Sequence, residues 1–301
     1  MTISRVGFIG LGNMGTPMAA HLADAGFALT VSDTAPGVVE RFVAAHPGSA
    51  AAAGRQSFAT AEALILMLPT SEIVENVLEG DDVAAALPAG CLVIDMSSSE
   101  PLRTRALAAR LQARGLPMLD APVSGGVRGA RAASLSVLVG GGEDDLARAA
   151  PLLSAMAGTI IRVGDIGSGH AAKALNNLVS AAAMSVTVEA LVIAGAFGIS
   201  ADTMTKVLNS SSGRSNTSEN KVAQFMTSGR FDSGFSLALM AKDVGLAIGL
   251  ADALDRPAEV ARHVADQWRR IAGQVGPATD HTQVYTLLGA EPDAAGAGAT
   301  R

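Results

Sequence analysis

Near its start the chain reads Val6-Gly7-Phe8-Ile9-Gly10-Leu11-Gly12-Asn13-Met14-Gly15, followed by Thr16-Pro17-Met18-Ala19-Ala20-His21-Leu22. An apolar run enters a G-x-G-x-x-G turn, and a helical pattern of apolar residues follows. The motif is weak by itself, but between a strand and a helix it is typical of a turn that binds a dinucleotide. The unpaired N–H groups in the first turn of such a helix, together with the helix dipole, favour a phosphate group there.

The three glycines of this turn have separate tasks. Gly10 permits a tight exit from the strand, and Gly12 lets the backbone approach a pyrophosphate without a Cβ atom in the way. Gly15 allows the helix to pack closely on the sheet. The sequence therefore predicts a dinucleotide site built on this turn.

An acidic residue follows at the expected distance. The next apolar run, Ala28–Ser32, ends in Asp33, which lies 21 residues after Gly12. An acid at this place holds the ribose hydroxyls of the adenosine and repels a 2′-phosphate, which favours NAD over NADP. The alternative is an ordinary glycine-rich turn followed by a solvated aspartate.

Composition indicates a globular protein. The chain has 301 residues, enough for about two domains, and 49 % of them are hydrophobic while 17 % are charged. The formal net charge is −6, and Lys and Arg form no cluster, which argues against a nucleic-acid partner. The single Cys91 lies in an apolar run, so we expect a buried, reduced thiol and no disulfide within the chain.

The sequence points away from membranes and metals. The start of the chain runs directly into a strand, without the pattern of a signal peptide. The Ala-rich segment after Val179 is the nearest approach to a membrane span, but it carries Ser, Thr and Glu189. The five histidines show no metal-ligand spacing. We expect a cytoplasmic protein with no metal site and no membrane partner.

The first half of the chain alternates strand-like and helix-like segments. Continuous apolar strands that alternate with amphipathic helices predict a parallel, doubly wound sheet of the Rossmann type over residues 1–165, with mixed pairing among the later strands. The expected strands lie at 6–9, 28–32, 63–68, 92–96, 118–121, 135–139 and 159–163, with a weak strand near 50. The expected helices lie near 38–45, 101–114 and 144–156.

The pattern changes after Gly164. Gly167-Ser168-Gly169 opens a long helical run that reaches toward Phe197, and only helical periodicity follows. Residues 166–290 are therefore predicted to form an all-α domain, joined to the first by one long helix, and 291–301 a flexible tail. Further helices are expected at 201–208, 219–226, 237–253 and 258–272, with a polar loop over 209–218.

Two segments carry candidate chemistry. In Asp120-Ala121-Pro122-Val123-Ser124-Gly125-Gly126 the serine hydroxyl and the glycine amides suit an anion such as a carboxylate, although a flexible connection would also need glycine. At the start of the long helix, Lys173 and Asn177 are four residues apart and share one face. A lysine among small apolar residues has a lowered pKa and can exchange protons near neutral pH; the alternative is a lysine that extends to solvent.

Together these residues resemble the β-hydroxyacid dehydrogenases, the family that contains 3-hydroxyisobutyrate dehydrogenase and tartronate semialdehyde reductase. The resemblance runs from about Arg5 to Leu288. It rests on four blocks that occur in the family's order: Gly7–Leu22, Met67-Leu68-Pro69, Asp120–Gly126 and Gly169–Asn177. Lys242-Asp243 completes the set, although such a pair could also be a solvated helix face.

The resemblance implies a role for each matching residue. Ser124, Gly125 and Gly126 should hold a substrate carboxylate, while Lys173 should be the catalytic acid/base and substrate contact, assisted by Asn177. The residues implied in cofactor binding are Gly10, Leu11, Gly12, Asn13, Met14, Gly15, Asp33, Leu68, Pro69, Ser98 and Lys242.

The resemblance also implies an activity. Lys173 would accept the proton of a β-hydroxyl while hydride passes to the nicotinamide of NAD, and would return that proton in the reverse direction. Fixed donors aimed at this oxygen stabilise the charge that develops there. The implied partners are a small carboxylate-bearing substrate and further copies of the chain, in a homodimer or homotetramer.

The chain departs from the family pattern in two places. The polar stretch Ser210–Asn220 lies where the family shapes its substrate pocket, and it suggests a polar or hydroxylated substrate rather than a branched apolar one. Arg131-Ala132-Ala133-Ser134 replaces a glycine-containing turn, a change we expect to be neutral.

Three other functions compete with the dehydrogenase. Imine or other carbonyl reductases share the scaffold, but imine reductases generally lack a lysine at the position of Lys173. A non-catalytic NAD(P)-binding protein would be expected to lose the lysine or the carboxylate-binding segment. A methyltransferase with a glycine-rich turn predicts neither a lysine on a long helix nor a second helical domain.

Overall fold

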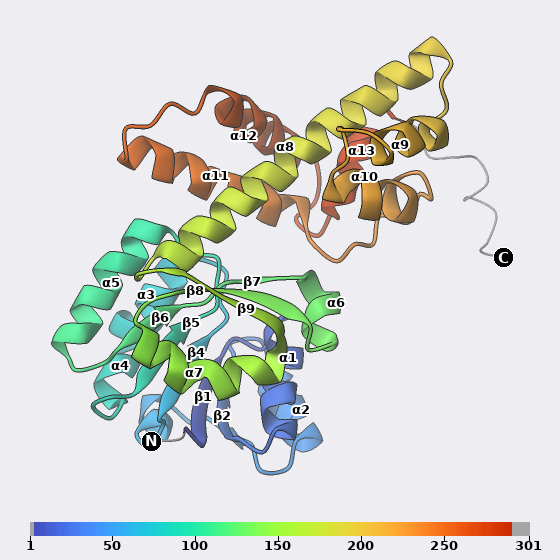
Figure 1. Cartoon of the computed structure of the whole chain (residues 1–301). Coiled ribbons are helices and arrows are strands. Elements are labelled where there is room, and N and C mark those ends of the chain that lie inside the picture. The colour runs from blue at the N-terminus through green and yellow to red at the C-terminus, as the bar shows by residue number, and fades with distance from the viewer. Residues whose placement is uncertain (1–2, 291–301) are drawn as a thin grey trace. The chain divides into compact units, whose positions relative to one another are not determined.

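The computed structural model describes residues 3–290 (Figure 1). The chain divides into two compact units inside helix α8 (Ser168–Phe197), between Lys173 and Ala174. The predicted domain limits, 1–165 and 166–290, remain a prediction. The expected flexible tail, 291–301, lies outside the described residues.

The first unit contains one large sheet. Within residues 3–290 nine strands join in the order β3-β2-β1-β4-β5-β6-β8-β7, and β9 pairs with β8. The strands from β3 to β6 on this path are parallel, whereas β8 runs antiparallel to β6 and β7 and parallel to β9. This confirms the predicted doubly wound sheet with mixed pairing. The strands are β1 (Arg5–Ile9), β2 (Ala28–Ser32), β3 (Ala50–Ala51), β4 (Ala63–Leu66), β5 (Leu92–Asp95), β6 (Met118–Asp120), β7 (Val123–Ser124), β8 (Leu135–Gly140) and β9 (Ala157–Gly164).

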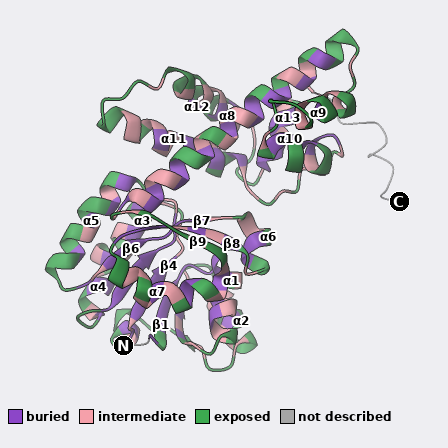
Figure 2. Cartoon of the chain, in the orientation of Figure 1, coloured by how far each residue is buried: buried purple, intermediate pink, exposed green. Residues whose placement is uncertain are grey.

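Alternate residues of the central strands enter two separate cores. In β4, Ala63 and Ile65 face one core, whereas Leu64 and Leu66 face the other. Both faces of these strands are buried (Figure 2), which is why the sequence shows continuous apolar runs there.

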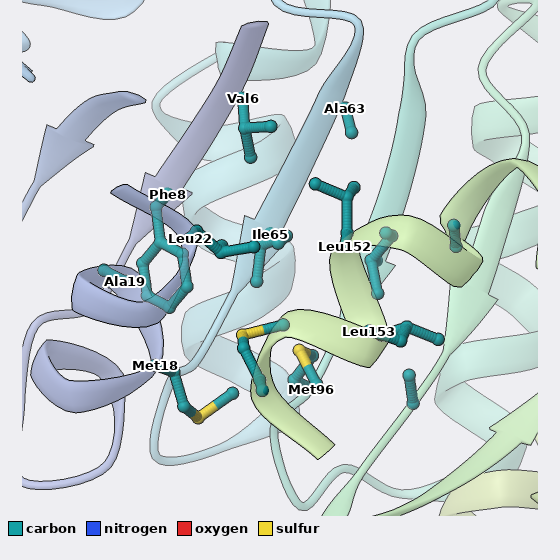
Figure 3. Packing of buried hydrophobic residues seen from close by; sticks show 14 of the residues in the cluster. Val6, Phe8, Met18, Ala19, Leu22, Ala63, Ile65, Met96, Leu152 and Leu153 are labelled. Atoms are coloured by element: carbon teal, nitrogen blue, oxygen red, sulfur yellow. The ribbon is translucent and has the colours of Figure 1, made fainter. Parts of the chain in front are cut away.

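Helices cover each face of the sheet. Figure 3 shows Met18 and Leu22 of α1 (Gly15–Asp24), and Leu152 of α7 (Glu143–Met156), packed among the side chains of β1 and β4. The helix α2 (Val38–Ala45) adds Phe42 to this core. On the other face, α5 (Pro101–Ala113) contributes Leu107 and Leu111. Cys91 is buried in this second core, and burial raises the pKa of its thiol to about 12.

The sequence did not predict the short helical segments of the first unit. They follow a strand end or a turn and are too short for a clear apolar period. These segments are η1 (Arg55–Phe58), α3 (Ser71–Glu75), η2 (Asn76–Gly80), α4 (Val83–Ala86) and α6 (Gly126–Arg131).

The second unit is helical and packs around Trp268, which is fully buried and donates a hydrogen bond from Nε1 to Ser185 Oγ at 3.0 Å. Met184 of α8 and Tyr285 lie in the same core. Its elements after α8 are α9 (Ala201–Asn209), α10 (Asn216–Asn220), η3 (Val222–Met226), α11 (Leu237–Ala253), α12 (Glu259–Ala272), η4 (His281–Gln283) and α13 (Val284–Leu287).

One predicted helix boundary is wrong. The helix expected over 219–226 is two segments, and α10 begins at Asn216, inside the predicted loop. The reason is a capping box: the side chain of Ser215 accepts a bond from the N–H of Ser218, whose hydroxyl oxygen accepts one from the N–H of Ser215.

By length and apolar composition alone, α8 could cross a membrane, and no other helix of residues 3–290 passes the same test. One such helix is weak evidence, because the core helix of a water-soluble domain has the same properties. In this structure α8 contributes Ala181, Val188 and Leu191 to the core of the second unit.

Candidate active site

The candidate residues of the first unit gather at one edge of its sheet. Parallel strands point their carboxyl ends the same way, so the segments after β1, β2, β4, β5 and β6 emerge at a common edge. Ligands of open α/β sheets bind at this edge. The glycine turn, Asp33, Leu68-Pro69, Ser98 and the Ser124 segment all lie there.

The glycines of the first turn serve different needs. A Cβ atom on Gly15 would lie 1.8 Å from the carbonyl oxygen of Gly10, and one on Gly10, where φ is 103°, would lie 2.3 Å from that of Met67. A Cβ atom on Gly12 would meet no atom of residues 3–290 within 4 Å. The first and third glycines are therefore required by the fold, whereas the second faces open space.

Asp33 is held beside this turn. Its Oδ2 accepts a bond of 2.6 Å from the N–H of Leu11, and its Oδ1 accepts one of 2.7 Å from the N–H of Ala35. An open approach at Gly12 and a fixed carboxylate at the end of β2 fit the pyrophosphate and the ribose of a dinucleotide. Gly12 and Asn13 are exposed and Met14 is half-buried, as a contact surface requires.

Hydrogen bonds connect the loops after β4 and β5. The N–H of Leu68 donates to Ser97 Oγ at 2.9 Å, and the N–H of Ser97 donates to Asp95 Oδ1 at 3.0 Å. Pro69 is exposed and Ser98 is half-buried. The two loops implied in cofactor binding are thus fixed to each other within the first unit.

The segment around Ser124 connects β7 to α6 through a tight turn. Ser124 pairs with Ser136 across β7 and β8, and the φ angles of Gly125 and Gly126 are 122° and 60°. These angles favour glycine for conformational reasons, so the backbone alone accounts for the two glycines. Gly125 is exposed, and Ser124 and Gly126 are half-buried, so this segment is open to solvent at the edge of the sheet.

Lys173 and Asn177 lie one turn apart on α8, and they are buried, with 8 % and 5 % of their surface exposed. In the second unit, Asn177 Nδ2 donates to Asp243 Oδ2 at 2.7 Å. Asp243 Oδ1 lies 3.4 Å from Lys242 Nζ. The structure therefore brings Asn177, Asp243 and Lys242 together in a polar cluster, in which the first two are buried and Lys242 is half-buried.

Asp243 and Asp120 belong to the blocks that resemble the family, but the sequence assigned neither of them a role. Asp243 is buried, and its carboxylate accepts a hydrogen bond from Asn177. Asp95 and Asp120 are also buried, at the ends of β5 and β6. The signal that marked Asp33, an acid at the end of an apolar strand, could have identified both.

The polar stretch 210–220 is largely bonded within itself. Besides the capping box, Asn209 Nδ2 donates to the carbonyl oxygen of Ser218 at 3.0 Å, and Arg214 forms an ion pair of 2.8 Å with Glu219. Thr217 and Ser218 are buried. Much of this polarity therefore has a structural function.

The turn after α6 is not neutral for the backbone, contrary to our expectation. Ala133 has a φ of 49°, in the left-handed region that favours glycine.

Residues 3–290 contain no group of three or more His, Cys, Asp or Glu side chains placed to hold a metal ion.

Two family models match the chain. The NAD binding domain of 6-phosphogluconate dehydrogenase matches residues 5–164, and the NAD-binding model of NADP-dependent 3-hydroxyisobutyrate dehydrogenase matches residues 167–288. Together they cover nearly the whole chain and show a nicotinamide-dinucleotide-binding oxidoreductase.

Relatives agree with these models. A probable 3-hydroxyisobutyrate dehydrogenase of Mycobacterium tuberculosis is 38 % identical over 291 residues, covering 95 % of this chain and 98 % of the relative. An NAD-dependent L-serine dehydrogenase of Pseudomonas aeruginosa is 39 % identical over 258 residues, covering 83 % and 86 %.

Solved structures give the same result. The M. tuberculosis 3-hydroxyisobutyrate dehydrogenase, solved with L-serine, has a TM-score of 0.89 at 37 % identity, covering 96 % of this chain and all of the other. An imine reductase of Streptomyces aurantiacus is similar in fold, with a TM-score of 0.62 over 94 % and 99 % of the two chains, but at 24 % identity this likeness shows the fold alone. The dehydrogenase interpretation is thus supported over the imine reductase, and the chain belongs to the β-hydroxyacid dehydrogenase family.

Proposed function

We propose that the chain interconverts a small β-hydroxyacid and its semialdehyde or keto form, with Lys173 as the acid/base. The observation that carries the proposal is the buried position of Lys173 near the start of α8, one helical turn before Asn177. A lysine amine that is held in one place can exchange a proton with a bound hydroxyl group.

The residues of the chain would divide the reaction between them. When bound, NAD supplies the carbon that accepts hydride in oxidation and, as NADH, returns it in reduction. In oxidation the Lys173 amine accepts the proton of the β-hydroxyl as hydride leaves the carbon that bears it. In reduction the Lys173 ammonium donates this proton to the carbonyl oxygen as negative charge develops there.

The other site residues would bind and orient. The Ser124 hydroxyl and the backbone N–H groups of Gly125 and Gly126 would hold the substrate carboxylate. Asn177 would direct an amide toward the reacting oxygen, with its side chain fixed by the hydrogen bond to Asp243. Lys242 would contribute a positive charge near the cofactor.

We favour NAD over NADP as the cofactor. One matching family model carries an NADP-dependent description and one relative an NAD-dependent name, so relatives alone leave the choice open. Asp33 supports NAD, because a carboxylate fixed at the end of β2 repels a 2′-phosphate.

A polar substrate is the second part of the proposal. The relative named L-serine dehydrogenase and the related structure solved with L-serine both favour a β-hydroxyacid with a polar substituent, since serine carries an amino group beside its β-hydroxyl. The exposed polar side chains of the 210–220 stretch add to this argument, although several of their neighbours bond only within the stretch.

We also propose that the chain pairs with a second copy of itself through α8. Three large side chains repeat every seven residues along the helix and are 62–69 % exposed: Val179, Val186 and Ile193. Val179 and Val186 line a groove of about 1000 Å³ between α8 and α12, which Val260 also lines. Glu189 and Arg270 lie on the same groove, so the surface carries both signs of charge and suits a twofold contact with itself.

We expect the protein to work in the cytoplasm without membrane or nucleic-acid partners. The net charge of −6 does not suit a nucleic acid. The buried residues of α8 support its role as a core helix of a water-soluble domain.

The test is absorbance at 340 nm with NAD or NADP and a panel of β-hydroxyacids, with the Lys173→Ala variant as the comparison. We expect the wild type to oxidise at least one β-hydroxyacid, and Lys173→Ala to bind NADH but show no turnover. No turnover of any β-hydroxyacid despite tight NADH binding would contradict the activity. A clear preference for hydroxyisobutyrate over glycerate, serine and threonate would contradict the polar substrate class.

A further inference from the structure

Three buried polar side chains lie together in the first unit, apart from the groups assigned to hydride transfer. Asp95, Asp120 and His170 are exposed by only 1 %, 0 % and 1 %. Asp95 and Asp120 are register partners at the ends of β5 and β6, so two carboxylates lie side by side inside the protein. Buried charges of one sign require compensation by hydrogen bonds or by an opposite charge.

Asp120 connects the sheet to the start of α8. Its Oδ1 accepts a bond of 2.6 Å from the N–H of Gly167, and its Oδ2 accepts one of 2.7 Å from the N–H of His170. The contact is close: a Cβ atom on Gly169 would lie 2.4 Å from the carbonyl oxygen of Leu138. The first turn of α8 is thus fixed directly to the ends of the strands.

The imidazole of His170 lies between the two carboxylates. Its Nε2 is 3.8 Å from Asp95 Oδ2, and its Nδ1 is 3.8 Å from Asp120 Oδ2. Nδ1 is also 2.8 Å from the hydroxyl of Thr104, which donates its hydrogen to the carbonyl oxygen of Glu100. The Thr104 hydroxyl therefore holds the Nδ1 side of the ring in place.

The second ring nitrogen of His170, Nε2, faces the carboxylate of Asp95. Nε2 is fully buried and has no hydrogen-bond partner among residues 3–290, and Asp95 Oδ2 is the acidic atom it approaches. The ring thus fills the space between the two carboxylates and turns a polar nitrogen toward each of them. A leucine of similar size could fill the space but would present no polar atom to either carboxylate.

We propose that His170 is a positioning residue for Lys173. Held between Asp95 and Asp120, it fixes the first turn of α8 and therefore the place of the Lys173 amine. The two residues are three apart on the helix and are neighbours on its surface. The inference rests on the proposed role of Lys173 as acid/base.

The same cluster lies close along the chain to a second part of the site. Asp120 ends β6, and Ser124 follows four residues later at the end of β7. One carboxylate thus connects the helix that bears the proposed acid/base with the segment proposed to hold the substrate carboxylate. A displacement of about 1 Å between such groups can lower a rate by about 10²-fold.

A double-mutant cycle tests this inference. We would measure kcat for the preferred β-hydroxyacid in the wild type, His170→Leu, Lys173→Ala and the double variant, with methylamine added to restore turnover in the two proteins that lack Lys173. His170→Leu is expected to lower kcat by about 10²-fold when Lys173 is present, with the KM for NAD changed by about twofold or less. In the Lys173→Ala background the loss should fall to about threefold or less, because a freely diffusing amine needs no positioning.

Two further variants keep the test decisive. His170→Gln, which retains an N–H donor, should recover part of the lost kcat. If His170→Leu does not fold, Thr104→Val removes the hydroxyl that holds Nδ1 and should lower kcat by about tenfold, again only when Lys173 is present.

The outcomes separate the two proposals. Equal losses in both backgrounds, or an unchanged kcat in His170→Leu, would overturn the positioning role alone. Full activity in Lys173→Ala would overturn the role of Lys173 and, with it, this inference.

Discussion

The carboxylate of Asp33 reaches back to the glycine turn, where its Oδ2 accepts a hydrogen bond of 2.6 Å from the backbone N–H of Leu11. The end of β2 and the first turn of the site are therefore one rigid unit. A negative charge held in this way has no freedom to move aside for a phosphate group.

Replacement of Asp33 by asparagine should relax the choice of cofactor. The amide oxygen of Asp33→Asn can still accept one of the two backbone bonds, but the repulsive charge is gone. We expect the preference for NADH over NADPH to fall by at least about tenfold, measured as the ratio of two Kd values from nucleotide fluorescence. Asp24→Asn, the same change at the exposed end of α1, is the control. A wild type that binds NADPH as tightly as NADH would refute this explanation.

Alanine at Gly15 and alanine at Gly12 should change different properties of the protein, the first its stability and the second its affinity for NADH. Gly15→Ala would place a Cβ atom 1.8 Å from the carbonyl oxygen of Gly10, so the free energy of unfolding should fall by about 2 kcal/mol or more. Gly12→Ala has free space around the new methyl group and should unfold like the wild type, yet bind NADH about tenfold more weakly. Urea unfolding and NADH titration of both proteins would check this, and similar stability losses in the two would contradict it.

Replacement of Ala133 by glycine should stabilise the protein. Ala133 has a φ of 49°, and an alanine in this region costs about 1–2 kcal/mol, part of which glycine loses again through the entropy of the unfolded chain. We expect Ala133→Gly to raise the free energy of unfolding by about 0.5–1 kcal/mol. Ala132→Gly is the matched control, because its φ of −91° suits alanine and the change should destabilise. Equal effects from both variants would show that Ala133 is not strained.

The stability of the second unit should depend on pH through His281. Burial first, and then the nearby charge of Lys221, lower the pKa of His281 to about 4. The unfolded chain, with a pKa near 6.5, binds this proton at higher pH than the folded one, so stability is complete above pH 6.5 and falls as the pH drops toward 4. The expected loss is on the order of 3 kcal/mol.

The single Trp268 reports on this unit. Urea midpoints from its fluorescence between pH 7 and pH 4 should fall in the wild type, while His281→Asn should show a flatter slope whatever its absolute stability. Parallel slopes in the two proteins would assign the acid sensitivity to other groups.

A charge among the exposed apolar side chains of α8 should prevent the chain from pairing with a second copy of itself. Val186→Asp would bury a carboxylate in the proposed apolar contact and should yield monomers in light scattering after size exclusion, at concentrations where the wild type is a dimer or larger. Val163→Asp on β9, which is also exposed but lies outside the groove, should leave the assembly unchanged. A monomeric wild type would remove the basis of this prediction.

The sequence predicts those parts of the fold that depend on local pattern. The buried strands around Ile65 and Ile94 are continuous apolar runs, and α11 is a long apolar segment, so their limits were correct within about two residues. The G-x-G-x-x-G turn and Asp33 were found in the same way, because both are defined by short spacings.

Contacts between distant residues could not be predicted. The bond from the N–H of Gly167 to Asp120 joins residues 47 positions apart, and the bond between Asn177 and Asp243 joins residues 66 apart. The sequence marks the segments that hold these residues, but nothing in it shows which residue of one segment bonds to which residue of another. The left-handed conformation of Ala133 was also invisible, since nothing in the residue type marks it.

The turn between β1 and α1 also has an evolutionary consequence. Gly10 and Gly15 are required by their own backbone neighbours, so a descendant that lost its cofactor would keep both in order to fold. A Cβ atom at Gly12 would meet no atom of residues 3–290 within 4 Å, so the fold does not require glycine at this position, whereas a bound pyrophosphate would. Among descendants of such a chain, a substitution at position 12 with Gly10 and Gly15 retained would therefore indicate that dinucleotide binding was no longer under selection.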